Sequence, residues 1–135
     1  MDAVQAISHL DIKFSEFKID TMSITAHKFG GPKGVGILLV KNNTPIEYSQ
    51  LGGEQETKRR AGTESVPQIV GMTKALEIAT KNRDQNNIHL MQLKELFLVS
   101  LQERAIPFEV NGSMVETTGH IPVSYTHLTL PTSDL

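Results

Sequence analysis

The chain of 135 residues contains no cysteine, and it has no long apolar run. The absence of cysteine excludes disulfides, thiolate zinc sites and a thiol nucleophile from this stretch of chain. No apolar run approaches the roughly 18 to 20 residues that cross a bilayer, and the first residues lack the basic and apolar regions of a signal peptide. We therefore expect a cytoplasmic location and no membrane partner.

The chain also has no excess of positive charge. Its 15 acidic side chains outnumber its 13 lysines and arginines, which gives a formal net charge of -2. Nucleic acids call for a clustered positive field, so we expect no nucleic-acid partner. The five histidines are scattered along the chain, so we also expect no metal site. What remains is an ordinary globular composition, with 39% hydrophobic residues and enough length to bury a core.

Two predicted strands flank a glycine-rich segment. Residues 18–25 alternate and are rich in β-branched side chains, and residues 35–40 predict a second, more fully buried strand. Between them, two adjacent glycines followed by proline predict a tight reversal of the chain. Lys28 therefore lies where a strand ends. If it is partly desolvated there, its amine has a lone pair that can attack a carbonyl; the alternative is a solvated surface lysine.

The middle of the chain changes from loop to helix. Residues 41–64 are polar and contain glycine, which predicts an extended loop. Ser65 is the predicted N-cap of an amphipathic helix that has Pro67 in its first turn and ends near Thr80.

A second helix is predicted after the polar segment 81–87, which interrupts the apolar period. Apolar residues then recur at three- and four-residue steps as far as Leu101, and we expect the two helices to pack as neighbours. Residues 106–110 predict a short strand, closed by the turn dipeptide at residues 111–112.

Several motifs follow one another in the first half of the chain. They are Asp2-Ala3-Val4-Gln5, the segment from Thr25 to Gly34, Gly52-Gly53-x-Gln55-Glu56, and Arg59-Arg60-Ala61-Gly62-Thr63-Glu64. In order and separation they resemble the cysteine desulfurase branch of the class V aminotransferases, which are pyridoxal-phosphate enzymes of fold type I. The resemblance implies an α/β fold, comprising part of the large cofactor-binding domain, with its mostly parallel sheet flanked by helices, and the start of the small C-terminal α+β domain.

The resemblance also implies roles for individual side chains. Lys28 is the implied catalytic residue, which forms a Schiff base with pyridoxal 5'-phosphate and shuttles protons. Asp2 is the implied partner of the pyridine nitrogen, where a carboxylate keeps the nitrogen protonated and the ring electron-withdrawing. The other implied cofactor contacts are Gln5 to the phenolic oxygen, Thr25 and His27 to the phosphate, and Thr63 to the phosphate of the neighbouring subunit in a homodimer.

The residues alone leave simpler interpretations open for three of these positions. Gln5 is then a surface glutamine, and His27 is a strand-end histidine whose hydrogen bonds are satisfied. Thr63 lies in a helix-capping turn that follows the solvated charge run 58–60.

The implied activity is conversion of L-cysteine to L-alanine, with sulfur passed as a persulfide to the enzyme's own cysteine and then to a sulfur-acceptor or iron–sulfur scaffold protein. Family members are longer and carry that cysteine on a downstream loop, so we expect this chain alone to be inactive. Alternatives are a related class V aminotransferase, a selenocysteine lyase, or a non-catalytic α/β module.

Three parts of the chain are expected. Residues 1–80 belong to the cofactor-binding domain, and residues 81–122 form a connecting helix and the start of the small domain. Residues 123–135 resemble the in-frame translation of a sequencing-library adapter, so we expect a non-native tail without function. By pattern alone this last stretch predicts a strand followed by a proline turn.

Overall fold

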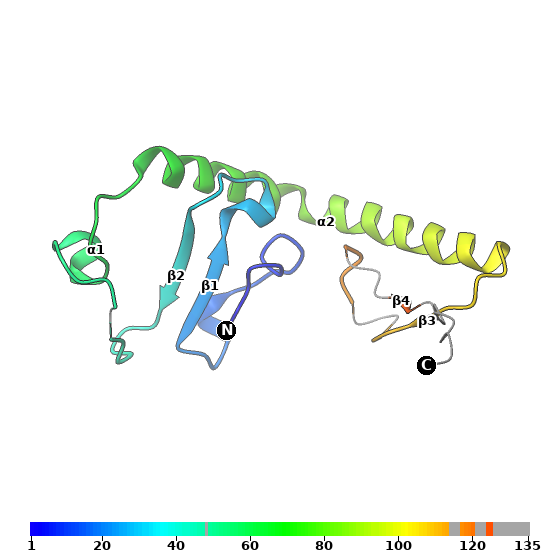
Figure 1. Cartoon of the computed structure of the whole chain (residues 1–135), viewed down its shortest axis with the longest axis horizontal. Coiled ribbons are helices and arrows are strands. Elements are labelled where there is room, and N and C mark those ends of the chain that lie inside the picture. The colour runs from blue at the N-terminus through cyan, green and yellow to red at the C-terminus, as the bar shows by residue number, and fades with distance from the viewer. Residues whose placement is uncertain (48, 114–116, 121–123, 126–135) are drawn as a thin grey trace, which may run out of the picture. The chain divides into compact units, whose positions relative to one another are not determined.

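The computed structural model describes residues 1–47, 49–113, 117–120 and 124–125 (Figure 1). The chain divides into two compact units, Met1–Arg83 and Asp84–Leu135. The elements in chain order are η1 (Phe14–Glu16), β1 (Thr21–Thr25), η2 (Ala26–Phe29), β2 (Gly36–Val40), α1 (Gln55–Lys58), α2 (Val66–Glu103), β3 (Glu109–Val110) and β4 (Ser124–Tyr125).

Strands β1 and β2 form an antiparallel pair, in register from Thr21 opposite Val40 to Thr25 opposite Gly36. Both strands fall within the ranges predicted from the sequence, and Figure 1 shows them side by side. The predicted reversal between them is confirmed. It begins with the 3-10 turn η2 and continues through Gly30 and Gly34, each at φ +82°, a backbone conformation that favours glycine.

The other edge of β1 carries the first residues of the chain in parallel orientation. The Ala3 N–H donates to the Ser23 carbonyl oxygen, and the Ser23 N–H donates to the Met1 carbonyl oxygen, both over 3.0 Å. Asp2 thereby forms a parallel bridge with Ser23. β1 is thus the central strand of the first unit, with an antiparallel neighbour on one edge and a short parallel one on the other.

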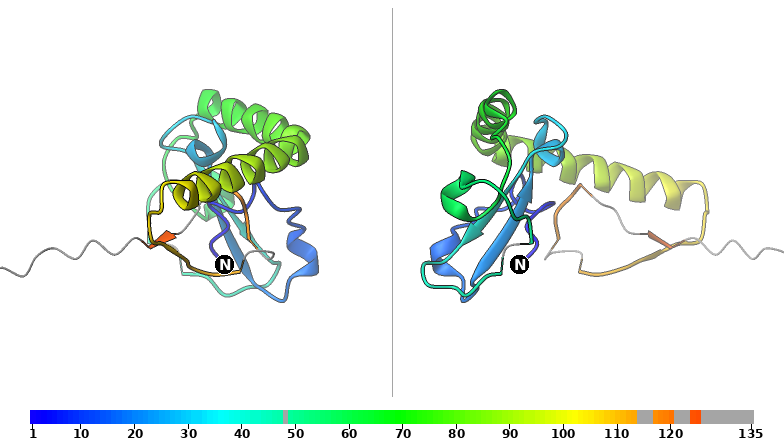
Figure 2. Two further views of the ribbon diagram at one scale, coloured as in Figure 1. Left: turned by 90° about the vertical axis from the view of Figure 1, so that its right-hand side faces the viewer. Right: turned by 60° about the vertical axis from the view of Figure 1, so that its left-hand side comes forward.

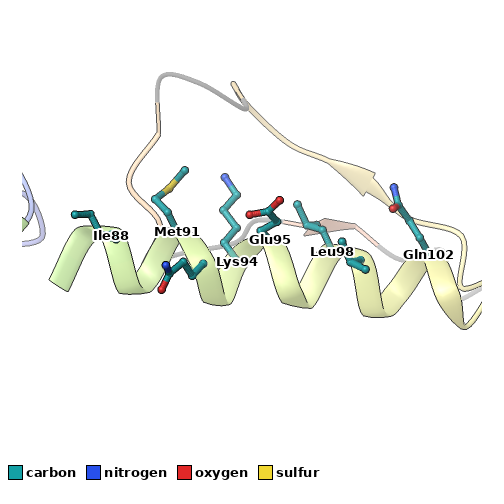
Figure 3. A pocket seen from close by; sticks show the side chains of 8 residues that line it. Ile88, Met91, Lys94, Glu95, Leu98 and Gln102 are labelled. Carbon is teal, nitrogen blue, oxygen red and sulfur yellow. The ribbon is translucent and has the colours of Figure 1, made fainter. Parts of the chain in front are cut away.

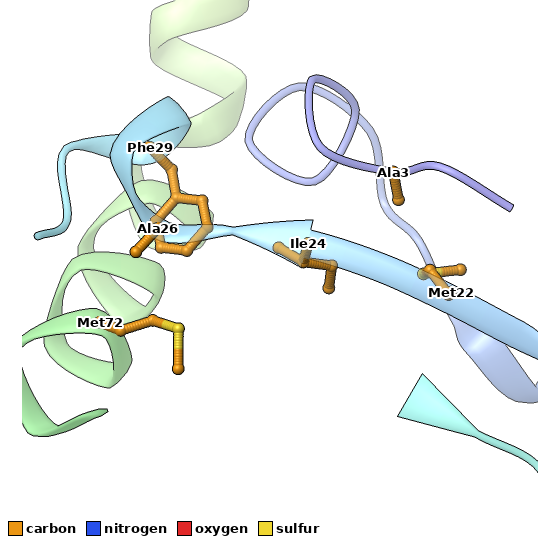
Figure 4. Close-up of a cluster of buried hydrophobic side chains, with 6 residues drawn as sticks. All are labelled: Ala3, Met22, Ile24, Ala26, Phe29 and Met72. Atoms are coloured by element: carbon orange, nitrogen blue, oxygen red, sulfur yellow. The ribbon is translucent and has the colours of Figure 1, made fainter. Parts of the chain in front are cut away.

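The core of the first unit lies between β1 and the first half of α2 (Figure 4). Side chains of β1 alternate between half-buried and buried, and the buried ones, Met22 and Ile24, lie in one cluster with Met72 of α2. Figure 2 shows the first turns of α2 beside the strand pair from two further directions. The cluster is completed by Ala3, Ala26 and Phe29.

The prediction that the second strand is the more fully buried one is wrong. β2 has no fully buried residue, and Leu38 keeps 57% of its surface exposed. Among the described residues β2 pairs with β1 alone, whereas β1 is paired on both edges. An apolar run indicates what a strand can bury, and its neighbours decide how much it does bury.

The predicted break between two helices is also wrong. α2 continues through the polar segment 81–87 as one helix, Val66–Glu103. That segment contains neither glycine nor proline, and polar residues on a solvent-facing turn do not stop a helix. The predicted start is confirmed, because the helix begins at Val66 and the Ile69 N–H donates to the Ser65 carbonyl oxygen over 3.0 Å.

In the second unit, β3 pairs antiparallel with β4. The strand predicted over residues 106–110 is confirmed for its last two residues, and Gly112 follows at φ +92°. The described part of the expected adapter-derived tail is β4, a short strand of the kind that its residue pattern predicts. Residue 123 and residues 126–135 of that tail lie outside the described residues, and its origin stays a prediction.

Candidate functional site

The pleat of β1 puts Asp2 and Thr25 on the same face of the sheet. Paired residues on neighbouring strands point to the same side, and side chains two positions apart along a strand do so too. Asp2 pairs with Ser23, and Thr25 lies two residues beyond Ser23. Ala3, Met22 and Ile24 point to the opposite face, where they are buried. The expected pyridine-nitrogen partner and one expected phosphate ligand therefore share a polar face.

The turn η2 carries His27 and Lys28 at the end of β1. Its first and last residues, Ala26 and Phe29, are buried in the core, so the two residues between them are directed toward solvent. The Thr25 Oγ1 lies 3.2 Å from the His27 Nδ1 and 3.4 Å from the Val35 carbonyl oxygen. The first contact joins a hydroxyl to an imidazole, and Lys28 is the residue that follows the imidazole in the chain.

The close return of the chain after Lys28 requires glycine at position 31. A Cβ placed on Gly31 would lie 2.9 Å from the Cβ of Ala26, closer than real Cβ atoms approach, and 3.0 Å from its carbonyl oxygen, which is also unusually close. The Gly31 N–H also donates to that oxygen over 2.9 Å. Gly31 thus fixes how tightly the chain folds back behind the lysine.

The described residues leave the side chain of Lys28 in contact with solvent. Lys28 is exposed, as is His27. The apolar neighbours that could shield the amine, Ala26 and Phe29, face the core on the other side of the turn. The described residues supply the amine at this position but do not exclude water from it.

The remaining two predicted site residues lie in different surroundings. Gln5 is exposed in the turn that follows Asp2, and the Asp2 Oδ1 accepts the Val4 N–H over 2.8 Å at the start of this turn. Thr63 is exposed in the loop between β2 and α2. The structure therefore places four predicted site residues on or beside β1: Asp2, Thr25, His27 and Lys28. Gln5 lies in the turn after Asp2, and Thr63 lies on a separate loop.

Two contacts of α2 with the reversal between β1 and β2 were not predicted from the sequence. The Gln68 Nε2 donates to the Lys33 carbonyl oxygen over 3.4 Å. A Cβ on Gly71 would lie 3.0 Å from the Cγ of Pro32, so the helix backbone approaches the glycine-proline segment closely. The residues in contact are more than 30 positions apart in the sequence, and no local pattern indicates such a pairing.

Two cavities lie away from the predicted residues. One, of about 510 Å³, follows the second half of α2 and is lined by Ile88, Lys94 and Leu98 among others (Figure 3). The other, of about 320 Å³, lies in the loop that leads into α1. Neither is lined by any of the six predicted site residues. Within the described part of the chain, no side chains cluster as a metal site and no helix is long and apolar enough to span a membrane.

Comparison with known proteins decides the family. The model of the family described as "Aminotransferase class-V" matches residues 1–128. The chain belongs to the class V aminotransferases. Members of this family depend on pyridoxal phosphate, and the fold is that of the fold type I enzymes, which confirms the predicted α/β class.

Individual relatives confirm the resemblance to cysteine desulfurases. The chain is 40% identical over 120 residues to the "Putative cysteine desulfurase IscS 1" of Bacillus subtilis, covering 89% of this chain and 32% of that protein. A solved NifS-like protein superposes with a TM-score of 0.81 at 33% identity, covering 87% of this chain and 32% of its own. The structure titled "SspA in complex with cysteine" has a TM-score of 0.61 at 32% identity, covering 82% and 30%. The chain thus spans about a third of its relatives' length.

Proposed function

We propose that this chain is part of a pyridoxal-phosphate-dependent cysteine desulfurase that converts L-cysteine to L-alanine and passes the sulfur on as a persulfide. The names of the relatives support the activity, and the cysteine complex of a structural neighbour supports the substrate. The receiving partner is a sulfur-acceptor or iron–sulfur scaffold protein. The observation that carries the proposal is the common polar face of Asp2 and Thr25, with Lys28 in the turn that follows.

The residues at this face fit an anionic aromatic aldehyde. Thr25 and His27 supply two hydrogen-bonding groups in mutual contact, suited to a phosphate. Lys28 supplies an exposed amine for the aldehyde carbon, and Asp2 supplies a carboxylate for a ring nitrogen. When bound, pyridoxal phosphate supplies a protonated ring that stabilises negative charge at the substrate carbon.

Each residue then has a distinct task. The Asp2 carboxylate would hold the proton on the pyridine nitrogen, and Gln5 would donate its amide N–H to the phenolic oxygen. Thr25 and His27, at the end of β1 and in the turn η2, would anchor the phosphate. The Lys28 amine would hold the cofactor and would move protons at the substrate carbons.

We further propose a homodimer in which Thr63 reaches the phosphate bound by the neighbouring subunit. The exposure of Thr63, on a loop separate from β1, supports a role toward another chain. We also propose a division at residues 80 and 81 between the cofactor-binding domain and the connecting helix. The boundary of the compact units between Arg83 and Asp84 supports that division.

Cofactor titration followed by visible absorbance tests the proposal. Adding pyridoxal phosphate to the chain should give an absorbance band that Lys28→Ala removes. Lys33→Ala is the matched control, because Lys33 is an exposed lysine on the same reversal. An unchanged band in Lys28→Ala, or equal losses in both variants, would overturn the assignment of the cofactor to Lys28.

Turnover by this chain alone is expected to be absent or very low. The chain contains no cysteine to accept sulfur, and its lysine is not shielded from water by the described residues. Incubation with L-cysteine and pyridoxal phosphate, followed by alanine quantification, measures this. Robust alanine formation would contradict the proposal that the persulfide step needs a cysteine elsewhere in the protein.

A further inference from the structure

Residues 50–61, between β2 and α2, form a closed loop that includes the short helix α1. The loop closes where the Ala61 N–H donates to the Gln50 carbonyl oxygen over 3.3 Å. Within it, Glu56, Thr57 and Lys58 all have positive φ, from 49° to 67°, which is unusual for three consecutive residues other than glycine. Side-chain contacts are therefore needed to hold the loop in this shape.

The two adjacent glycines in this loop provide room for two specific side chains. A Cβ on Gly52 would lie 3.0 Å from the Cβ of Ala61, the buried residue of the loop. A Cβ on Gly53 would lie 2.9 Å from the Nε2 of Gln55 and 3.0 Å from its Cδ. The contact with Ala61 explains glycine at position 52, and glycine at position 53 leaves room for the end of the Gln55 side chain in its observed place.

The side chain of Gln55 connects the two motifs of this loop. It lies against Gly53, and its Oε1 accepts the Gly62 N–H over 3.1 Å. Gly62, at φ +103°, is the residue immediately before Thr63. A second contact, from the Glu56 N–H to the Glu64 Oε1 over 3.4 Å, joins the same two segments on the other side of Thr63.

We propose that Gln55 is a positioning residue: its amide, seated on Gly53, holds Gly62 in place and thereby fixes where the loop presents Thr63. The role of Thr63 toward a phosphate is part of the proposed function, on which this second step rests. The clamp itself depends only on the contacts among Gly53, Gln55 and Gly62.

Amide hydrogen exchange of Gly62, measured by NMR on the whole chain, tests the clamp without any cofactor. Gln55→Met keeps the side-chain volume but removes the acceptor, so Gly62 should exchange faster by on the order of fivefold, as expected for one lost hydrogen bond. Gln55→Glu keeps an acceptor oxygen and should retain protection. Gln68→Met is the matched control, because Gln68 bonds to Lys33 in the same unit and not to this loop.

Gly53→Ala provides a second, independent variant, since its new Cβ displaces the Gln55 amide. It should raise Gly62 exchange as Gln55→Met does, and the double variant should exceed neither single variant by more than about twofold, because both remove one contact. Unchanged exchange in Gln55→Met and in Gly53→Ala would overturn the clamp.

Cofactor titration separates this inference from the proposed function. Gln55→Met and Thr63→Val should both weaken pyridoxal phosphate binding, while Thr63→Val leaves Gly62 exchange unchanged. If Gly62 exchange responds in Gln55→Met but neither variant alters cofactor affinity, the clamp is supported and the proposed phosphate role of Thr63 fails.

Discussion

The two halves of α2 have similar apolar content and one buried apolar side chain each, but only the first half packs in the core cluster with β1. In the first half, Met72 is 5% exposed and lies in that cluster, although Val70 is 63% exposed. In the second half, Leu98 is 9% exposed, but Met91 is 38% exposed and Leu96 is 62% exposed. A periodic apolar pattern therefore shows that a helix has an apolar side, but the neighbouring elements decide whether that side becomes a core.

The largest expected effect comes from truncating the methionine of the first half. Met72→Ala removes a buried side chain from the core and should lower the free energy of unfolding by about 2–5 kcal/mol. Met91→Ala, on the same helix, should lower it by less than about 1 kcal/mol, because Met91 is already partly in water. Denaturant unfolding measures both, and equal effects would contradict the contrast between the halves.

A proline at the junction tests whether the two halves are one helix. Asn86→Pro should reduce helical circular dichroism and destabilise the chain by about 3 kcal/mol, because it removes a backbone hydrogen bond and clashes with the preceding turn. Asn86→Ala is the control and should preserve helicity. Full helicity in the proline variant would restore the break predicted from residues 81–87.

An intermediate effect is expected where the chain packs closely behind the candidate lysine. Gly31→Ala forces a Cβ against the Ala26 backbone and should destabilise the first unit by about 1–3 kcal/mol. Lys33→Ala, nearby in the same reversal but exposed, should change stability by less than about 0.5 kcal/mol. Thermal unfolding compares the two variants. A neutral Gly31→Ala would show that the close return of the chain does not require glycine at position 31.

The smallest effect is expected from a surface ion pair. Arg83 contacts the Asp11 carboxylate over 3.0 Å, joining the end of the first unit to its N-terminal segment. Asp11→Asn should lower the free energy of unfolding by about 0.2–1 kcal/mol, and the difference should shrink at high salt. Glu77→Gln, which removes the exposed local pair with Lys74, should have a still smaller effect.

Local signals in the sequence were sufficient for the strand pair and its reversal. The alternation of residues 18–25 and the glycines after Lys28 act over a few residues, and the structure confirms both. The burial of β2 and the continuity of α2 were missed for different reasons. Burial depends on distant partners, and a polar segment without glycine or proline does not reveal whether a helix stops there.

The candidate site shows the same division. The order of the motifs predicted the candidate site residues, and the pairing of Asp2 with Ser23 explains how Asp2 and Thr25 come to share a face. Motif order could not indicate that Lys28 is exposed or that Gln55 bonds to Gly62. Those facts depend on which side of a turn faces the core and on how one loop folds back on itself.

The most direct test of the central claim is covalent labelling of Lys28. Pyridoxal phosphate is added to the chain, borohydride reduction fixes the attached cofactor, and peptide mapping locates it. We expect the label to concentrate on the peptide that carries Lys28. Lys33, on the same reversal, and Lys41, directly after β2, should carry little label. Label spread evenly over these lysines, or absent from Lys28 at saturating cofactor, would contradict it.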